Sequence, residues 1–251
     1  MPCSSARVYA ALVTTVLFVR HGRSTANASG TLAGWLPGVG LDDSGRAQAT
    51  AVGERLAAAG VPVAEIVSSP LERCLETADL VGAALETPHQ SVHEGLGECR
   101  YGAWTGRPLA ELAKEDLWKV VQQEPSRARF PGSTAYAGES LTQMWDRALQ
   151  AVRETDARIR GSHGDDAVWV AVSHGDVIKA IVSEAVGATL DQFQRIHVDP
   201  GSLTVIRYTR THPFLVRLND TGGDLAGLRP SEHAVVPEGE AVVGGGTGAV
   251  G

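Results

Sequence analysis

The sequence has few cysteines and no excess of positive charge, and each lack excludes a class of protein. Its three cysteines, Cys3, Cys74 and Cys99, are an odd number and do not have the spacing of a zinc site or a CxxC redox motif. This usage fits a reducing compartment, so we predict a cytoplasmic protein. The net charge of −7 excludes broad attraction to nucleic acid or to an anionic membrane, so an anion site has to be local.

The apolar run from Val8 to Val19 is too short to span a bilayer. It has about the length of a signal peptide, Arg7 precedes it, and Ala26-Asn27-Ala28 resembles a cleavage site. Cleavage there would remove the histidine that follows the run. We therefore interpret residues 1–14 as an N-terminal extension of a cytoplasmic protein.

Two apolar runs end in a histidine followed by a glycine. Residues 16–19 lead into Arg20-His21-Gly22, and residues 168–172 lead into Ser173-His174-Gly175. In an open α/β sheet, ligands bind at the carboxyl ends of the strands, where the next helix offers free backbone N–H groups. A glycine at this point, such as Gly175, allows a sharp turn and a close approach of the backbone to a ligand. The two motifs together predict an anion site that contains both histidines.

Apolar periodicity predicts alternating strands and helices along most of the chain. The expected strands are 15–20, 63–67, 91–93, 167–172, 203–208 and 214–218. The expected helices are 43–60, 70–85, 109–123, 138–160 and one after Gly175, with Pro70 in the first turn of the second. This alternation predicts an α/β protein with a layered sheet that helices cover on both faces.

The length of 251 residues suits one large α/β domain, which we assign to residues 15–218. Within it, residues 107–138 lie between sheet elements and are expected to form an insertion that caps the pocket. From residue 219 the sequence turns to glycine and charge with little bulk. Residues 219–251 are therefore expected to form a disordered tail.

The residue types near the two histidines suit a phosphoryl group. The planar donor fork of a guanidinium group matches a pair of phosphoryl oxygens, so Arg20 and Arg73 are the expected clamps. A neutral imidazole is a competent nucleophile, and we assign to His21 the formation of a phosphohistidine that water later hydrolyses. His174 would donate to a phosphoryl oxygen and stabilise the charge of the transition state.

The leaving alkoxide needs a proton, which a protonated carboxyl group can supply. Glu98 is the expected acid, because repulsion from a bound phosphate would raise its pKa. Glu94 is the alternative acid. For Arg73, the alternative role is an ion pair with Glu72 or Glu76 on the surface of its helix.

This chemistry requires no metal and no other cofactor. His89 and His93 have a spacing that resembles zinc ligands, but Pro88 breaks the helical face that such ligands need. Cys74 and Cys99 adjoin the proposed catalytic residues and are expected to be buried, inert thiols. We therefore predict no metal site.

Four short motifs resemble the histidine phosphatase superfamily, in its phosphoglycerate mutase-like branch. In the family's order they are Arg20-His21-Gly22, Ser68-Ser69-Pro70-Leu71-Glu72-Arg73, Glu98-Cys99-Arg100-Tyr101-Gly102 and Ser173-His174-Gly175. The resemblance implies a three-layer α/β/α sandwich, with a mainly parallel central sheet that is mixed at one edge. It also implies a phosphohistidine intermediate, places Arg23 and Asn27 in the phosphate pocket, and is compatible with a homodimer.

Two departures from the mutases favour hydrolysis. The mutases carry an arginine and a histidine directly after the acid, where this chain has Cys99 and Arg100. They also carry adjacent arginines in a longer insertion, whereas this insertion has the scattered cations Lys114, Lys119, Arg127 and Arg129.

The sequence therefore predicts a phosphatase that acts on a small phosphorylated metabolite, with neither nucleic acid nor membrane as a partner. Besides the catalytic groups, we expect Arg100, Tyr101 and Gly175 to contact the substrate, because they adjoin the acid or the second histidine. Two alternatives stay open. They are a phosphoglycerate-type mutase with the same intermediate and a phospho-ligand binding module without turnover.

Overall fold

The computed structural model describes residues 13–86 and 90–223. Within them, one six-stranded sheet has the order β3-β2-β4-β1-β5-β6. Its strands are β1 (Thr14–Arg20), β2 (Val63–Ser68), β3 (Gln90–Val92), β4 (Val168–Ser173), β5 (Leu203–Tyr208) and β6 (Pro213–Asp220). β1 to β4 are parallel, whereas β5 is antiparallel to both of its neighbours. The expected mainly parallel sheet with a mixed edge is confirmed.

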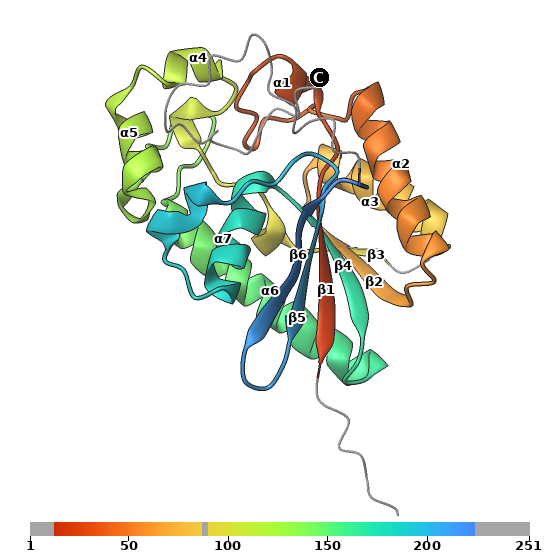
Figure 1. Cartoon of the computed structure of the whole chain (residues 1–251). Helices are drawn as coiled ribbons and strands as arrows, with labels where there is room; N and C mark the ends of the chain where they lie inside the picture. Colours follow the sequence, from red (N-terminus) through yellow and green to blue (C-terminus); the bar gives the residue numbers. More distant parts are fainter. Residues whose placement is uncertain (1–12, 87–89, 224–251) are drawn as a thin grey trace, which may run out of the picture.

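Helices cover both faces of this sheet (Figure 1). They are α1 (Thr25–Ala28), α2 (Asp43–Ala58), α3 (Glu72–Leu85), α4 (Leu109–Leu112), α5 (Asp116–Gln123), α6 (Leu141–His163) and α7 (Gly175–Ala185). Short 3-10 helices are η1 (Glu94–Leu96), η2 (Gly102–Trp104), η3 (Pro125–Arg127) and η4 (Leu190–Arg195). α2 and α3 pack on one face, and α6 and α7 pack on the other, which confirms the three-layer sandwich.

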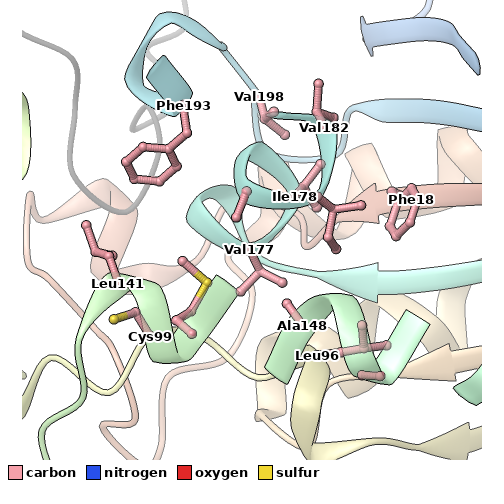
Figure 2. Packing of buried hydrophobic residues seen from close by; sticks show 14 of the residues in the cluster. Phe18, Leu96, Cys99, Leu141, Ala148, Val177, Ile178, Val182, Phe193 and Val198 are labelled. Atoms are coloured by element: carbon pink, nitrogen blue, oxygen red, sulfur yellow. The ribbon is translucent and has the colours of Figure 1, made fainter. Parts of the chain in front are cut away.

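The central strand β1 is buried on both of its faces. Because alternate side chains of a strand point to opposite faces, Leu17 and Val19 join the core under α2 and α3. Val16 and Phe18 join the core under α6 and α7, part of which is drawn in Figure 2. This double burial explains why the strand reads as a continuous apolar run in the sequence.

The start of α3 differs from the prediction. The helix begins at Glu72, so Pro70 does not lie in its first turn. The backbone N–H of Leu71 donates to the Ser69 hydroxyl at 3.3 Å, and Leu71 has extended backbone angles. Pro70 therefore belongs to the bend that leads from β2 into the helix.

The expected helix at 109–123 consists of two helices, α4 and α5. The break falls next to Glu115, whose carboxylate accepts hydrogen bonds from Trp104 Nε1 at 2.7 Å and from Arg107 Nη1 at 2.6 Å. These bonds, from residues 11 and 8 positions earlier in the chain, hold Glu115 at the start of α5, so the prediction of one continuous helix was wrong.

Residues 107–138 pack on the loop that follows β1. The backbone N–H of Leu32 donates to the carbonyl of Arg107 at 2.9 Å. Trp118 of α5 is buried, and its ring centroid lies 6.2 Å from that of Trp104. The segment thus shares the core of the domain, while its role as a cap over the substrate stays a prediction.

The two ends of the chain were predicted as an extension and a disordered tail. Residues 1–12 and 224–251 lie outside the part of the chain that the structure describes. β6 ends at Asp220, two residues beyond the expected end of the domain.

Candidate active site

The two histidines follow neighbouring strands of the sheet. β1 pairs with β4 so that Arg20 lies opposite Ser173, and the backbone N–H of His21 donates to the Ser173 carbonyl at 3.0 Å. His21 and His174 therefore emerge side by side, with ring centroids 5.2 Å apart and an interplanar angle of 62°. Both side chains are buried. The structure thus brings the two sequence-predicted histidines together at the carboxyl ends of the strands.

Arg73 lies between the two histidines. It projects from the first turn of α3, and its Nε donates to His21 Nε2 at 3.3 Å. Its Nη2 is 3.2 Å from His174 Nδ1 and donates to the Gly34 carbonyl at 3.0 Å. The side chain is 2% exposed, so the alternative role in a surface ion pair is not observed.

The hydrogen bonds of His21 define which nitrogen carries its proton. His21 Nδ1 is 2.8 Å from the Gly22 carbonyl, which can only accept, so we place the proton on Nδ1. Nε2 then keeps a lone pair. Burial, followed by the charges of Arg73 and Arg20, holds the pKa of His21 well below its ordinary value of 6.5. At neutral pH the ring is therefore neutral and suited to nucleophilic attack through Nε2.

His174 is the residue directly before α7, and its two ring nitrogens have different surroundings. Nε2 is 2.7 Å from Ser69 Oγ and 3.4 Å from Cys74 Sγ, in the interior. Nδ1 faces Arg73 and lies 3.9 Å from Glu98 Oε2. Burial, then the charge of Arg73, holds the pKa of His174 well below 6.5. Nδ1 is therefore the nitrogen that a bound phosphoryl group would meet.

Glu98 is the carboxyl group next to the two histidines. Its side chain is buried, and Oε1 accepts a hydrogen bond from the backbone N–H of Cys99 at 2.9 Å. Burial, followed by repulsion from Asp176, raises the pKa of Glu98 to about 7. A substantial fraction of this group is therefore protonated at neutral pH, as a general acid requires. The alternative acid, Glu94, is 80% exposed and pairs with Arg100 at 3.7 Å, away from these contacts.

Arg147 of α6 holds the loop that carries Glu98. Its guanidinium donates to the carbonyls of Gly95, Gly97 and Glu98 at 2.8–2.9 Å and forms an ion pair with Glu139. Sequence reasoning missed this residue, because an arginine on an amphipathic helix reads as a solvent-facing charge. Its position beside the buried residues Met144, Ala148 and Ala151 of α6 could have indicated a partly buried role.

Arg20 is completely buried at the end of β1. Its Nη1 donates to the Val198 carbonyl at 2.7 Å. Burial lowers its pKa to about 10, against the opposing charges of Glu98, Asp199 and Asp176. Arg20 therefore stays cationic at neutral pH and adds a second buried positive charge to that of Arg73.

Two residues that the resemblance places in the phosphate pocket have protein partners. Arg23 Nε donates to Asp42 Oδ2 at 2.6 Å, and its Nη2 donates to Ser44 Oγ at 3.1 Å. Asn27 Oδ1 accepts from the backbone N–H and the hydroxyl of Ser24 at 3.0 and 2.8 Å, as part of the cap of α1. Their contact with a phosphate stays a prediction.

The residues after Glu98 point in different directions. The Tyr101 hydroxyl donates to Asp176 Oδ2 at 2.7 Å inside the domain. The Arg100 guanidinium stacks on the Trp35 ring, 3.9 Å from its centroid. Cys99 points into the core drawn in Figure 2. Their contact with a substrate, like that of Gly175 at the start of α7, stays a prediction.

The glycine after His21 has a structural reason that differs from the expected approach to a ligand. A Cβ on Gly22 would lie 2.2 Å from the carbonyl oxygen of Gly45, in the first turn of α2. A Cβ on Gly45 would likewise collide with the backbone of Arg23. The glycine thus allows α2 to pack directly on the chain next to His21.

Residues 13–86 and 90–223 lack two features that would indicate other classes of protein. They hold no group of three or more His, Cys, Asp or Glu residues arranged to bind a metal ion. Nor does any helix in them have the length and hydropathy needed to cross a membrane. Of the two histidines with zinc-like spacing, at which no metal was predicted, His89 lies outside these ranges. The Nδ1 of the other, His93, accepts from the Gly95 backbone N–H at 3.0 Å.

Comparison with known proteins places this site in a family. The histidine phosphatase superfamily (branch 1) matches residues 16–221. Phosphoglycerate mutase-like protein 4 of Arabidopsis thaliana is 31% identical over 172 residues, which are 68% of this chain and 70% of that protein. The metal-independent phosphoserine phosphatase of Arabidopsis thaliana is 31% identical over 171 residues, or 67% of each. The solved structure of Bacillus stearothermophilus YhfR, 26% identical, has a TM-score of 0.72 and covers 82% of this chain and 97% of that one. Both the matched motifs and the shared fold lead to one conclusion: the chain belongs to the histidine phosphatase superfamily.

Proposed function

We propose that the protein is a metal-independent phosphatase of small phosphomonoesters that works through a phosphohistidine on His21. The observation that carries this proposal is the contact of Arg73 with both histidines, at 3.3 and 3.2 Å, next to a buried carboxyl group. Such a cluster offers a nucleophile, guanidinium donors and an acid to one tetrahedral group. The proposal includes a cytoplasmic location and is compatible with a homodimer.

The first chemical step forms the covalent intermediate. Arg20, Arg73 and His174 bind the phosphoryl oxygens, and the lone pair on His21 Nε2 attacks phosphorus in line with the leaving oxygen. The N–P bond forms as the P–O bond to the alcohol breaks, and the leaving oxygen keeps the electron pair. Glu98 transfers its proton to that oxygen, so the alcohol leaves uncharged.

The second step returns the enzyme to its starting state. Glu98, now a carboxylate, accepts a proton from a water molecule as the water oxygen attacks phosphorus. The N–P bond breaks, its electron pair returns to His21 Nε2, and inorganic phosphate is released. The raised pKa of Glu98 suits both directions, because the group must give and regain a proton near neutral pH.

The cations of the insertion support hydrolysis over phosphate transfer between two hydroxyl groups. Lys119 is 75% exposed and lies 3.8 Å from Asp116, while Arg127 is 76% exposed and pairs with Glu124. These side chains therefore lie on the surface of the insertion, where they face neighbouring carboxylates. The similarity to a mutase-like protein and to a phosphatase keeps the mutase as the second candidate.

The release of phosphate from p-nitrophenyl phosphate tests the proposal. We expect turnover by the wild-type protein and a loss of about a thousand-fold or more in His21→Ala. His163→Ala, which changes an exposed histidine in the last turn of α6, serves as the matched control and should retain activity. Equal rates for wild type and His21→Ala would reject the enzyme and favour a binding module.

A second assay separates phosphatase from mutase. The protein is incubated with 3-phosphoglycerate and 2,3-bisphosphoglycerate, and both free phosphate and the 2-phosphoglycerate isomer are measured. We expect phosphate release. Exchange of isomers without free phosphate would reject the hydrolase and support the mutase.

A further inference from the structure

Ser69 places a buried hydroxyl against the second histidine, and the mechanism above does not use it. The side chain is completely buried, with Oγ 2.7 Å from His174 Nε2. The Leu71 backbone N–H donates to the same oxygen at 3.3 Å, which occupies one lone pair. The hydroxyl keeps one proton and one lone pair, so it can accept from Nε2 or donate to it.

The other nitrogen of His174 determines which of these two bonds forms. Arg73 Nη2, which only donates, lies 3.2 Å from Nδ1, so Nδ1 is an acceptor in this arrangement. A neutral ring then carries its proton on Nε2 and donates it to Ser69. The Ser69 proton in turn can point to the neighbouring Cys74 thiol, whose Sγ lies 3.4 Å from the same His174 Nε2.

When a phosphoryl group binds, His174 Nδ1 has to donate a hydrogen bond instead of accepting one. A phosphoryl oxygen can only accept, and Nδ1 is the nitrogen on the side of Arg73 and Glu98. His174 must therefore carry a proton on Nδ1 if it is to stabilise the transferred group. A neutral ring can do so only if Nε2 becomes an acceptor, and a buried acceptor needs a donor.

We propose that Ser69 is a positioning residue whose hydroxyl reverses its hydrogen bond with His174, so that a neutral His174 becomes a donor to the phosphoryl group. This inference rests on the proposed function. The exchange balances, because the ring loses one proton at Nε2 and gains one at Nδ1, on the side that the bound anion would occupy. The Ser69 proton turns from Cys74 to Nε2, and the net charge of the ring is unchanged.

Nitrogen NMR of the full chain labelled with ¹⁵N-histidine tests this directly, with inorganic phosphate as the probe. The His174 signals are assigned by their loss in His174→Gln. We expect the proton on Nε2 without phosphate and on Nδ1 with phosphate. A proton that stays on Nε2, or protonation of both nitrogens in the complex, would overturn the inference even if the enzyme hydrolyses esters. Absence of phosphate binding together with absence of turnover would reject the proposed function as well.

Variants at position 69 add a kinetic test. We expect Ser69→Ala to lower kcat about ten-fold or more with little change in KM, because the transition state loses the oriented donor. Ser69→Thr keeps the hydroxyl and should recover most of the loss. Ser183→Ala, a buried serine of α7 that donates to the Lys179 carbonyl at 3.0 Å, is the matched control.

The outcome of these variants stays interpretable if one of them is unstable. Wild-type kcat in folded Ser69→Ala would overturn the inference. If Ser69→Ala does not fold, the proton positions of the wild-type protein and the kcat of Ser69→Thr decide. A Ser69→Thr protein that folds and binds phosphate, yet keeps the proton on Nε2 in the complex, would overturn it.

Discussion

The cluster at the ends of β1 and β4 is positioned by backbone pairing, whereas the loop that carries Glu98 is positioned by side chains. His21 and His174 follow strands whose register is set by the parallel ladder from Thr15 to Arg20. The Glu98 loop instead depends on Arg147, which binds three of its carbonyls, and on Trp35, whose Nε1 donates to the Glu98 carbonyl at 2.6 Å.

The two regions should therefore respond differently to substitution. The ladder has many backbone hydrogen bonds, which do not depend on any one side chain, so single conservative substitutions in these strands should leave the histidines in place. The loop depends on a few long side chains, so the loss of one of them should displace the acid. Changes in the strand-end cluster should therefore affect the chemistry itself, and changes around the loop should affect the delivery of the proton.

The largest effect is expected for Arg73→Ala in the strand-end cluster. The variant removes donors to the phosphoryl group and the contacts with both histidines, so kcat/KM on p-nitrophenyl phosphate should fall about a thousand-fold or more. Arg46→Ala, at a half-exposed arginine that pairs with Glu76, is the control and should be close to wild type. A loss below ten-fold for Arg73→Ala would remove this residue from the phosphate site.

Glu98→Gln should have a large effect that depends on the leaving group. Alkyl phosphates need the proton, so their kcat should fall about a hundred-fold or more. Aryl phosphates made from acidic phenols release a stable phenolate anion that needs no proton, so their kcat should fall far less. Steady-state rates on one ester of each kind measure the contrast. Similar losses on both would place the acid elsewhere.

The pH dependence should follow the same carboxyl group. Because burial and Asp176 raise the pKa of Glu98 to about 7, the acid form is lost as pH rises through 7. The kcat for alkyl phosphates should decline there, and Glu98→Gln should lack this decline. The folded protein binds this proton more tightly than the unfolded chain, whose carboxyl has a pKa near 4.5. The stabilisation that this bound proton gives the folded protein is complete below about pH 4.5 and is lost as the pH rises through 7. A kcat that rises steadily from pH 6 to 8 would contradict the assignment.

Arg147→Ala should have a smaller effect on catalysis and a clear effect on stability. The change leaves the Glu139 carboxylate, whose side chain is 9% exposed, without its guanidinium. The free energy of unfolding should fall by about 3 kcal/mol, measured by urea denaturation, and kcat on alkyl phosphates should fall about ten-fold. Wild-type rates in a destabilised variant would show that the loop keeps Glu98 in place by other contacts.

The smallest effect is expected for Glu94→Gln, four residues before the acid. The Glu94 carboxylate is 80% exposed, and its ion pair with Arg100 is long at 3.7 Å. Both kcat and KM should stay within about two-fold of wild type. A loss as large as that of Glu98→Gln would reverse the assignment of the acid.

The strand-end cluster was the part of the site that sequence could predict. An apolar run that ends in Arg20-His21 or Ser173-His174 marks the carboxyl end of a buried strand, and such ends meet at one edge of a parallel sheet. The layers followed from the alternation of apolar runs and helical periodicity. These signals lie within short stretches of the chain, so they can be recognised from the sequence alone.

The supports of the acid could not be predicted, because their contacts are long-range. Arg147 reaches carbonyls 49 to 52 residues earlier in the chain. Asp176 receives the Tyr101 hydroxyl across 75 residues, and its charge helps to raise the pKa of Glu98. The division of the helix at 109–123 has a related cause, since Glu115 accepts hydrogen bonds from Trp104 and Arg107, which lie outside the helical stretch. No periodicity within one element encodes such partners.

The two buried guanidinium groups link anion binding to thermal stability. Arg73 and Arg20 lie close enough that the charge of the first lowers the pKa of the second, so folding brings like charges together out of water. An oxyanion bound as we propose would act as a counter-ion for both and would bind the native chain in preference to the unfolded one. On this proposal, phosphate in the buffer should raise the melting temperature, so melting temperatures recorded with and without it should describe two different states of the same protein.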